Sequence, residues 1–209
     1  MASFERSHVH ALLTEHTKSP NLVKHMVAVE VAMRAYAERF GEDPDRWGAL
    51  GLLHDHDYES NPFPDDVQAR VAADPGVTLP EGEYHPWVGV RRLRQLGYDE
   101  EFCDAILAHA EFTGVPRASR MARALYAVDE LCGLITAAAL IRPDRDVRGV
   151  ELPSLKKKFK DKAFARGVHR DQIRNGTAEL GVELDEHMQF TLDAMKGAAA
   201  ELGLDGKAG

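Results

Sequence analysis

Residues 48–59 read GALGLLHDHDYE, and this stretch decides how the chain folds around its chemistry. The apolar run with small residues predicts a closely packed helix that starts near Pro44 and ends at His54 and Asp55. A histidine and a charged aspartate there are costly to bury without a partner, and a metal ion supplies one. Neighbouring helical residues point about 100° apart, so both side chains reach one centre only where the metal lies between them.

Helical patterns dominate the rest of the chain, and strand patterns are nearly absent. Ser19 and Pro20 predict the start of a helix, and Gly41 predicts its end. The other expected helices lie over 85–95, 99–110 and 117–140, with a short one at 65–73 inside a loop over 60–83 and further ones near 155–166, 170–180 and 185–202. We therefore predict an all-α bundle of about eight helices.

The composition is that of one soluble globular domain. The chain has 209 residues, of which 44% are hydrophobic and 29% are charged. These values exclude a disordered, collagen-like or disulfide-stapled chain. We expect a single domain over 1–209, with a core at 20–140 and a C-terminal helical extension at 141–205.

Hydropathy, cysteine usage and charge indicate the cellular compartment and exclude some classes of partner. The longest apolar window, 131–141, is too short for a membrane span, and the N-terminus carries no export signal. Cys103 and Cys132 are well separated in apolar helical surroundings, so we expect buried free thiols and a cytoplasmic protein. A net charge of -8 argues against a general nucleic-acid binder.

Several predicted helices each contribute one histidine or acid that ends the helix or faces inward, and the helix at 44–55 contributes a doublet. Bundle proteins build metal sites in this way, because facing helices project side chains into a shared centre. Four imidazoles and two carboxylates suit iron, manganese or zinc, and a carboxylate bridge allows two ions. The predicted ligands are His25, His54, Asp55, His85, His109 and Asp129.

The order of these residues resembles the HD-domain superfamily of metal-dependent phosphohydrolases over about residues 20–140. The resemblance is carried by His25, by the doublet in GLLHDHDYE, and by Asp129 in ALYAVDELCG. His85 in HPWVGVRRL and His109 in AILAHAEF resemble the two extra histidines of the binuclear subgroup. That subgroup includes HD-GYP phosphodiesterases, bacterial diadenosine-polyphosphate hydrolases and a few di-iron oxygenases. The resemblance implies an HD-like bundle, but the GYP triplet is absent, which argues against a cyclic-dinucleotide substrate.

His56 and Asp57 form a second doublet that offers an alternative register for the motif. We favour His54 and Asp55 as the ligands, because that pair closes the apolar run. His56 and Asp57 fall in the following loop, where they support the ligands or face the substrate. We assign to them, as catalytic residues, the protonation of the leaving oxygen.

The segment 151–170 carries a local excess of five positive charges in an otherwise acidic chain. One interpretation is the solvated face of an amphipathic helix whose other face is apolar. The other has Lys158, Lys162 or Arg166 turned toward the metal cleft to bind substrate phosphate. Arg92 is a further candidate phosphate ligand, because it lies close in sequence to a predicted metal ligand.

The leading functional prediction is a metal-dependent phosphohydrolase acting on a nucleotide or another small phosphate ester. One or two divalent transition ions would activate water for attack on phosphorus. The alternatives are a di-iron oxygenase on the same scaffold and a non-catalytic signalling module with a structural metal. The expected partner is a small phosphorylated substrate, with no membrane and no general nucleic-acid binding, and the sequence indicates no oligomeric state.

Overall fold

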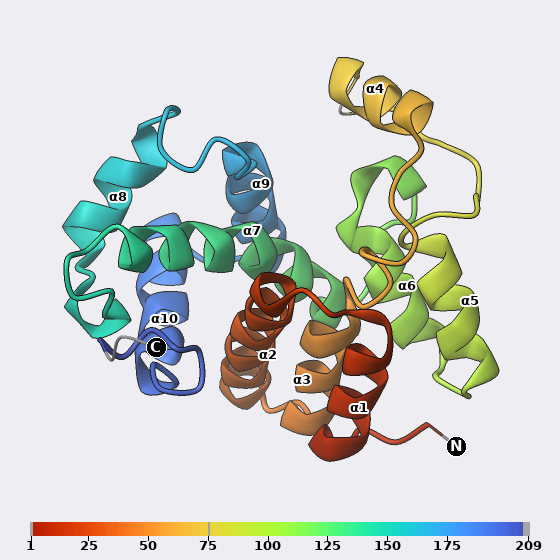
Figure 1. Cartoon of the computed structure of the whole chain (residues 1–209), viewed down its shortest axis with the longest axis horizontal. Coiled ribbons are helices and arrows are strands. Elements are labelled where there is room, and N and C mark those ends of the chain that lie inside the picture. The colour runs from red at the N-terminus through yellow and green to blue at the C-terminus, as the bar shows by residue number, and fades with distance from the viewer. Residues whose placement is uncertain (1, 75, 207–209) are drawn as a thin grey trace.

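The computed structural model describes residues 2–74 and 76–206, and this part of the chain contains ten α-helices and no β-strand. The all-α prediction is confirmed (Figure 1). The helices are α1 (Arg6–His16), α2 (Pro20–Phe40), α3 (Pro44–Leu53), α4 (Asp65–Ala73), α5 (Trp87–Gln95), α6 (Glu100–His109), α7 (Arg120–Leu140), α8 (Leu152–Lys160), α9 (Arg170–Leu180) and α10 (Leu184–Gly197). Two 3-10 helices, Glu111–Thr113 and Val147–Gly149, complete the set.

Local sequence signals explain where most of these helices begin and end. Ser19 precedes Pro20 at the start of α2, and Gly41 ends the helix with a left-handed φ of 70°, a conformation that glycine adopts without strain. The Asp43 side chain accepts hydrogen bonds from the Asp45 and Arg46 backbone nitrogens and so caps α3. The predicted bounds of α4 and α9 agree with the structure.

Three predicted helices differ from the structure by three residues or more at one or both ends. Helix α7 starts at Arg120 rather than at 117, because the Ser119 hydroxyl caps it by accepting from the Ala122 nitrogen. Helix α8 spans Leu152–Lys160 instead of 155–166, with a proline in its first turn, and the residues after it form turns. Helix α10 ends at Gly197, and the residues up to 203 also form turns.

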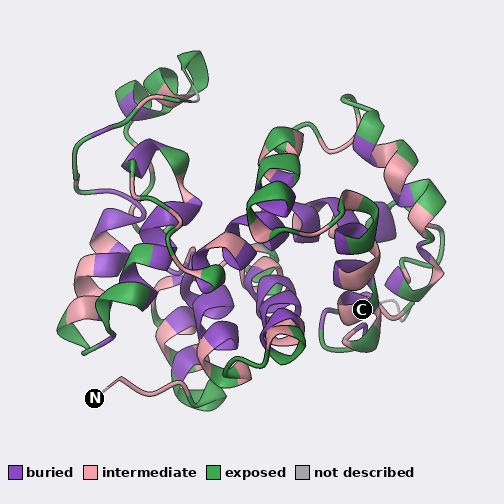
Figure 2. Ribbon diagram, turned by 180° about the vertical axis from the view of Figure 1, so that it is seen from behind, coloured by how far each residue is buried: buried purple, intermediate pink, exposed green. Residues whose placement is uncertain are grey.

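Helix α7 is the central element, and helices from both ends of the sequence pack against it. Figure 1 shows it running between a group that contains α2, α3 and α6 and a group that contains α8, α9 and α10. Thirteen of its 21 residues are buried, and Figure 2 shows the buried residues on the facing sides of the helices. The site residues described below gather where α7 meets α2, α3 and α6.

A buried polar chain joins the C-terminal extension to the core. The Tyr36 hydroxyl on α2 donates to Nδ1 of His187 on α10 at 2.6 Å, and His187 Nε2 donates to the Ala127 carbonyl on α7 at 2.9 Å. Helix α9 also approaches α7 closely, since a β-carbon on Gly176 would come within 2.7 Å of the Ala127 Cα. One continuous cluster of buried apolar side chains reaches from Val9 to Leu204.

None of the helices in the described residues has both the length and the apolar character that a membrane crossing requires.

Candidate metal centre

The six predicted ligands lie together, although they come from five separate segments of the chain. His25 is in the second turn of α2, His54 and Asp55 directly follow α3, and His109 is the last residue of α6. His85 precedes α5, and Asp129 lies near the middle of α7. The helical bundle therefore brings residues that are up to 104 positions apart in the sequence into one cluster.

One half of the cluster contains His25, His54, Asp55 and Asp129. The Asp129 Oδ1 atom lies 2.9 Å from His25 Nε2 and 3.6 Å from His54 Nε2. Asp55 Oδ2 lies 3.6 Å from His54 Nε2. One donor atom each from His25, His54 and Asp55 lies within 4.8 Å of the others, which is close enough to share one ion.

The other half contains Asp55, His85 and His109. Asp55 Oδ1 lies 3.2 Å from His85 Nε2 and 3.3 Å from His109 Nε2, and the three donor atoms again lie within 4.8 Å of one another. Asp55 thus faces one group of ligands with Oδ2 and the other group with Oδ1. A carboxylate placed in this way can bridge two cations.

Hydrogen bonds on the far sides of the imidazole rings direct their Nε2 atoms toward the centre. His54 Nδ1 donates to the Gly51 carbonyl at 2.8 Å, and His109 Nδ1 donates to the Ile106 carbonyl. The Nε2 atom of His54 is buried and has no hydrogen-bond partner among the described residues. A buried lone pair directed at two carboxylates fits a cation, so the residues present suit a bound metal.

The carboxylates of the cluster also need a compensating positive charge. Burial lowers the pKa of His54, but the fields of Asp55 and Asp129 outweigh it and raise the pKa to about 9. Burial raises the pKa of Asp55, but the surrounding histidines outweigh it and hold the pKa far below its usual value. The two carboxylates therefore stay ionised, and either protons or a metal ion can balance them.

The centre is open to solvent on one side. The His54 side chain is completely buried, whereas those of Asp55 and Asp129 are 17% and 15% exposed. The His25 side chain is 25% exposed. A small molecule can therefore approach from the side of His25 and the two carboxylates.

His56 and Asp57 are both buried and hydrogen-bonded to other parts of the chain, and the proton donation assigned to them stays a prediction. The His56 Nδ1 atom donates to the Leu53 carbonyl at 2.6 Å, and burial lowers the pKa of this histidine. Asp57 accepts from His85 Nδ1 and from the Gly89 backbone nitrogen, each at 2.7 Å. Burial raises the Asp57 pKa, but these contacts outweigh it and keep the carboxylate ionised.

Two residues beside the centre were not predicted. The Tyr58 side chain is 42% exposed, and its ring centroid lies 5.2 Å from that of His85. Glu130 accepts from the His169 backbone nitrogen at 3.1 Å, and burial together with Asp129 raises its pKa to about 7. Each directly follows a predicted site residue, Asp57 or Asp129, and this adjacency in the sequence could have indicated them.

The predicted phosphate ligands are dispersed. Lys158 lies over the Phe164 ring at 5.4 Å, and Lys162 and Arg166 are exposed. Arg92 on α5 pairs with Glu15 at 2.9 Å. Figure 1 shows α8 at the opposite end of the molecule from α5, so these basic residues do not form one cluster.

The guanidinium that packs within the basic segment belongs to Arg170 rather than to Arg166. It donates to five carbonyls of the preceding turns, namely those of Phe159, Asp161, Phe164, Ala165 and Val168. The segment then returns to α7, where the His169 nitrogen contacts Glu130. Its last residues therefore lie beside Glu130, the neighbour of Asp129, while all its lysines except Lys162 lie on α8.

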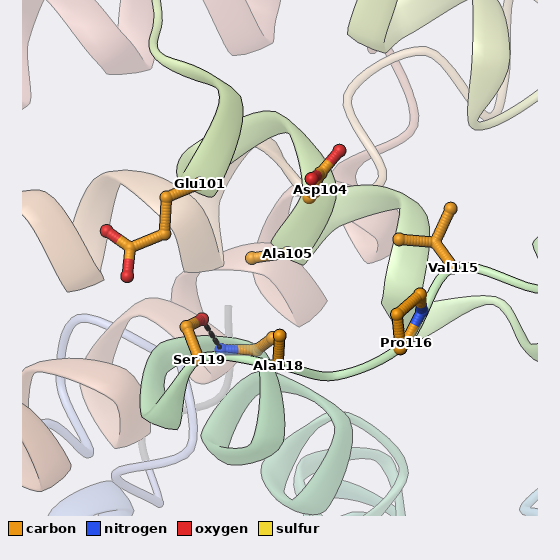
Figure 3. Close-up of a pocket in the computed structure, with 8 residues that line it drawn as sticks. Glu101, Asp104, Ala105, Val115, Pro116, Ala118 and Ser119 are labelled. Atoms are coloured by element: carbon orange, nitrogen blue, oxygen red, sulfur yellow. Dashed lines mark hydrogen bonds between the residues drawn. The ribbon is translucent and has the colours of Figure 1, made fainter.

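A pocket of about 400 Å³ lies elsewhere, between α6 and the start of α7 (Figure 3). Its lining includes Glu101 and Asp104, together with small and apolar residues such as Val115 and Pro116. Both acids already have partners, since Glu101 pairs with Arg46 at 3.0 Å and Asp104 lies 3.6 Å from Arg94. The pocket contains no histidine among its lining residues and is separate from the metal centre.

These observations define a helical bundle with a centre of histidines and aspartates. The model of the HD domain family matches residues 22–135, which is more than half of the chain. The chain therefore belongs to the HD-domain family, as the order of its histidines and aspartates predicted, and members of this family are mostly metal-dependent hydrolases. No curated protein and no solved structure shows significant similarity to the chain.

Proposed function

We propose that this protein is a metal-dependent phosphohydrolase acting on a nucleotide or another small phosphate ester. The observation that carries the proposal is the position of Asp55, whose two carboxylate oxygens face two separate groups of histidines. Two-cation sites of this kind clamp the attacking and leaving oxygens of a phosphoryl group. Membership of the HD-domain family supports the same class of reaction.

The residues divide into two sets of ligands. His25, His54, Asp55 and Asp129 would hold one ion, and Asp55, His85 and His109 would hold the second. The imidazole-rich set favours iron, manganese or zinc over magnesium. When bound, such ions lower the pKa of a coordinated water and neutralise charge on the phosphoryl oxygens.

The nucleotide part of the proposal rests on Tyr58. Its exposed ring lies against His85 at the edge of the centre, where it can stack on a planar group of a bound substrate. Arg166, Lys162, Lys158 and Arg92 remain proposed phosphate ligands, of which Arg166 is closest in sequence to the contact between His169 and Glu130. Both cysteines are free and buried, which suits a reducing compartment such as the cytoplasm.

A di-iron oxygenase is the second candidate, because four imidazoles and two carboxylates suit iron as well as zinc or manganese. Oxygen dependence separates the two reactions, since hydrolysis does not need O₂. The two candidates therefore call for one experiment carried out in air and under nitrogen.

The experiment combines metal analysis of protein purified without added metal with a screen of phosphate esters in the presence and absence of O₂. We expect one to two transition ions per chain and hydrolysis that is independent of O₂ and lost on chelation. His54→Ala should lose metal and activity together, whereas His8→Ala, at an exposed histidine of α1, should keep both. Metal-free protein whose activity resists strong chelators would refute the proposal, and turnover only in air would favour the oxygenase.

A further inference from the structure

Three of the buried histidines of the centre are oriented in the same way. His54, His56 and His109 each direct Nδ1 to the carbonyl three residues earlier, namely those of Gly51, Leu53 and Ile106. This contact is available because each histidine lies at or just after the end of a helix, where the last carbonyls have no partner within the helix. Their ring orientation therefore comes from their own helices.

His85 lies before its helix and has no such carbonyl. It precedes α5, which begins at Trp87, and the residue three positions earlier, Gly82, lies in a loop. His85 Nδ1 instead contacts Asp57 Oδ1 at 2.7 Å, across 28 positions of sequence. Its Nε2 atom is left facing Asp55 Oδ1 at 3.2 Å.

Asp57 is itself fixed by the first turn of α5. Its Oδ2 atom accepts from the Gly89 backbone nitrogen at 2.7 Å, so the carboxylate also caps this helix from a distant part of the chain. The approach requires glycine, because a β-carbon at position 89 would lie 2.5 Å from the Asp57 Cγ atom. The Asp57 side chain is only 5% exposed, so water competes little for either contact.

Backbone hydrogen bonds through Asn61 also connect Asp57 to His85. The Asn61 nitrogen donates to the Asp57 carbonyl at 2.8 Å, and the His85 nitrogen donates to the Asn61 carbonyl at 2.8 Å. Asp57 and His85 are therefore joined twice, through their side chains and through one turn of the chain. This double connection leaves the imidazole little freedom to rotate.

We propose that Asp57 is a positioning residue, which holds His85 as the tautomer with its proton on Nδ1 and leaves Nε2 free to bind the second ion. The inference rests on the proposed two-ion centre for its consequence, but the tautomer itself is a property of the metal-free chain. An ionised carboxylate can only accept hydrogen bonds, so His85 Nδ1 and the Gly89 nitrogen both donate to Asp57. His85 Nε2 also faces a carboxylate oxygen, Asp55 Oδ1, but at 3.2 Å, so the shorter contact of 2.7 Å places the single proton of a neutral ring on Nδ1. Gly89 contributes to the same positioning, because the lack of a side chain at position 89 leaves room for the Asp57 carboxylate.

Asp57→Asn tests this assignment with almost no change of volume. The amide has one acceptor oxygen and one donor nitrogen for two donor partners. When its oxygen stays on the Gly89 nitrogen, its NH₂ group faces His85 Nδ1 and favours the tautomer protonated on Nε2. Gly89→Ala keeps the carboxylate but displaces it, and should have the same effect on His85.

Glu59→Gln is the matched control. Glu59 Oε2 accepts from the backbone nitrogens of Lys18 and Ser19, so this carboxylate also ties the same loop to a helix start. Neither of these two hydrogen bonds involves a predicted metal ligand. The substitution should leave the His85 tautomer and the number of bound ions unchanged.

Two measurements decide the proposal. Nitrogen-15 NMR of the metal-free protein at a fixed alkaline pH should show His85 protonated on Nδ1 in the wild type and Glu59→Gln, and on Nε2 in Asp57→Asn. Titration with zinc should show affinity for the second ion about 10–100-fold weaker in Asp57→Asn and Gly89→Ala, with the first ion retained. A wild-type His85 protonated on Nε2, or an Asp57→Asn variant with unchanged tautomer and second-ion affinity, would overturn it. A wild type that binds one ion but keeps the expected tautomer would refute the two-ion centre and leave the role of Asp57 standing.

Discussion

Gly51 on α3 lies against the backbone of Glu30 on α2, so closely that a β-carbon at position 51 would come within 2.7 Å of the Glu30 nitrogen. This contact sets the distance between the two helices that carry His54 and His25. Glu30 is itself fixed, because its buried carboxylate accepts hydrogen bonds from Arg6 and Arg34. Neither backbone can therefore move away without breaking other contacts.

Gly51→Ala is expected to destabilise the fold and loosen the metal centre together. Overpacking of a close contact costs about 1–3 kcal/mol, and here the added methyl group meets backbone atoms, which yield least. Moving α3 away from α2 would separate His54 from His25, so zinc affinity should fall as well. Urea unfolding of the metal-free protein and zinc titration measure the two effects.

Gly133→Ala is the control for this prediction. Gly133 also lies inside a helix, but the nearest described atom to an added β-carbon is Val168 Cγ2, at 3.9 Å. Alanine is a better helix former by about 0.5–1 kcal/mol, so this variant should be more stable than the wild type. Equal effects at positions 51 and 133 would show that the close approach of α2 and α3 does not matter.

His109→Ala should remove about one ion per chain and leave part of the first site filled. His109 faces only the Oδ1 side of Asp55, while His25, His54 and Asp129 gather on the other side of the cluster. Metal analysis of the variant beside the wild type measures the change. An unchanged metal content would show that His109 is an ordinary buried helix residue and not a metal ligand.

Local signals in the sequence predicted most of the helices and the residues of the histidine and aspartate cluster, because both follow from short patterns. Ser19, Pro20 and Gly41 mark the ends of α2, and the doublet at His54 and Asp55 closes an apolar run. The sequence predicted that Asp57 supports a ligand or faces the substrate, but not that its partner is His85, which lies 28 positions away and meets it only through the docking of α5. Spacing alone gives no information on such a contact.

The packing of the basic segment was not predicted, for a similar reason. Charge and spacing singled out Arg166, whereas the turns after α8 are held by Arg170, which donates to five backbone carbonyls. Those carbonyls converge only after the segment has folded back on itself. A count of charges cannot distinguish a guanidinium that packs from one that is exposed.

Arg170→Ala is accordingly expected to destabilise the extension, whereas Lys157→Ala should not. A hydrogen bond from a charged group contributes about 1.5–3 kcal/mol, and Arg170 makes several, to half-buried carbonyls, whereas substitution of an exposed lysine changes stability by about 0.5 kcal/mol or less. Urea unfolding gives both values. Arg166→Ala belongs in the same series as a kinetic test, because a contact with substrate phosphate would raise KM without changing stability.

Tyr58→Ala should raise KM for a nucleotide and leave KM for a substrate without an aromatic group, such as glycerol phosphate, nearly unchanged. Stacking of a base on an aromatic ring is worth about 1–3 kcal/mol, so the increase should be about fivefold or more. Tyr58→Phe keeps the ring and should behave as the wild type. An equal rise for both substrates would assign Tyr58 to the packing of His85 rather than to substrate binding.

His187 should make the stability of the fold depend on pH below neutrality. Burial lowers its pKa from 6.5 to about 4, and the nearby Arg39 charge adds to this effect, which outweighs the hydrogen bond to the Ala127 carbonyl. The unfolded chain binds a proton at a higher pH than the folded chain, so this stabilisation is complete above about pH 6.5 and is lost as the pH falls toward 4. Between pH 7.5 and pH 5 the loss amounts to about 2 kcal/mol by proton linkage. His187→Gln cannot titrate, so the difference in unfolding free energy between wild type and variant should shrink by that amount over this range. A difference that stays constant from pH 7.5 to pH 5 in urea unfolding of the metal-free proteins would show that His187 does not couple protonation to the docking of α10.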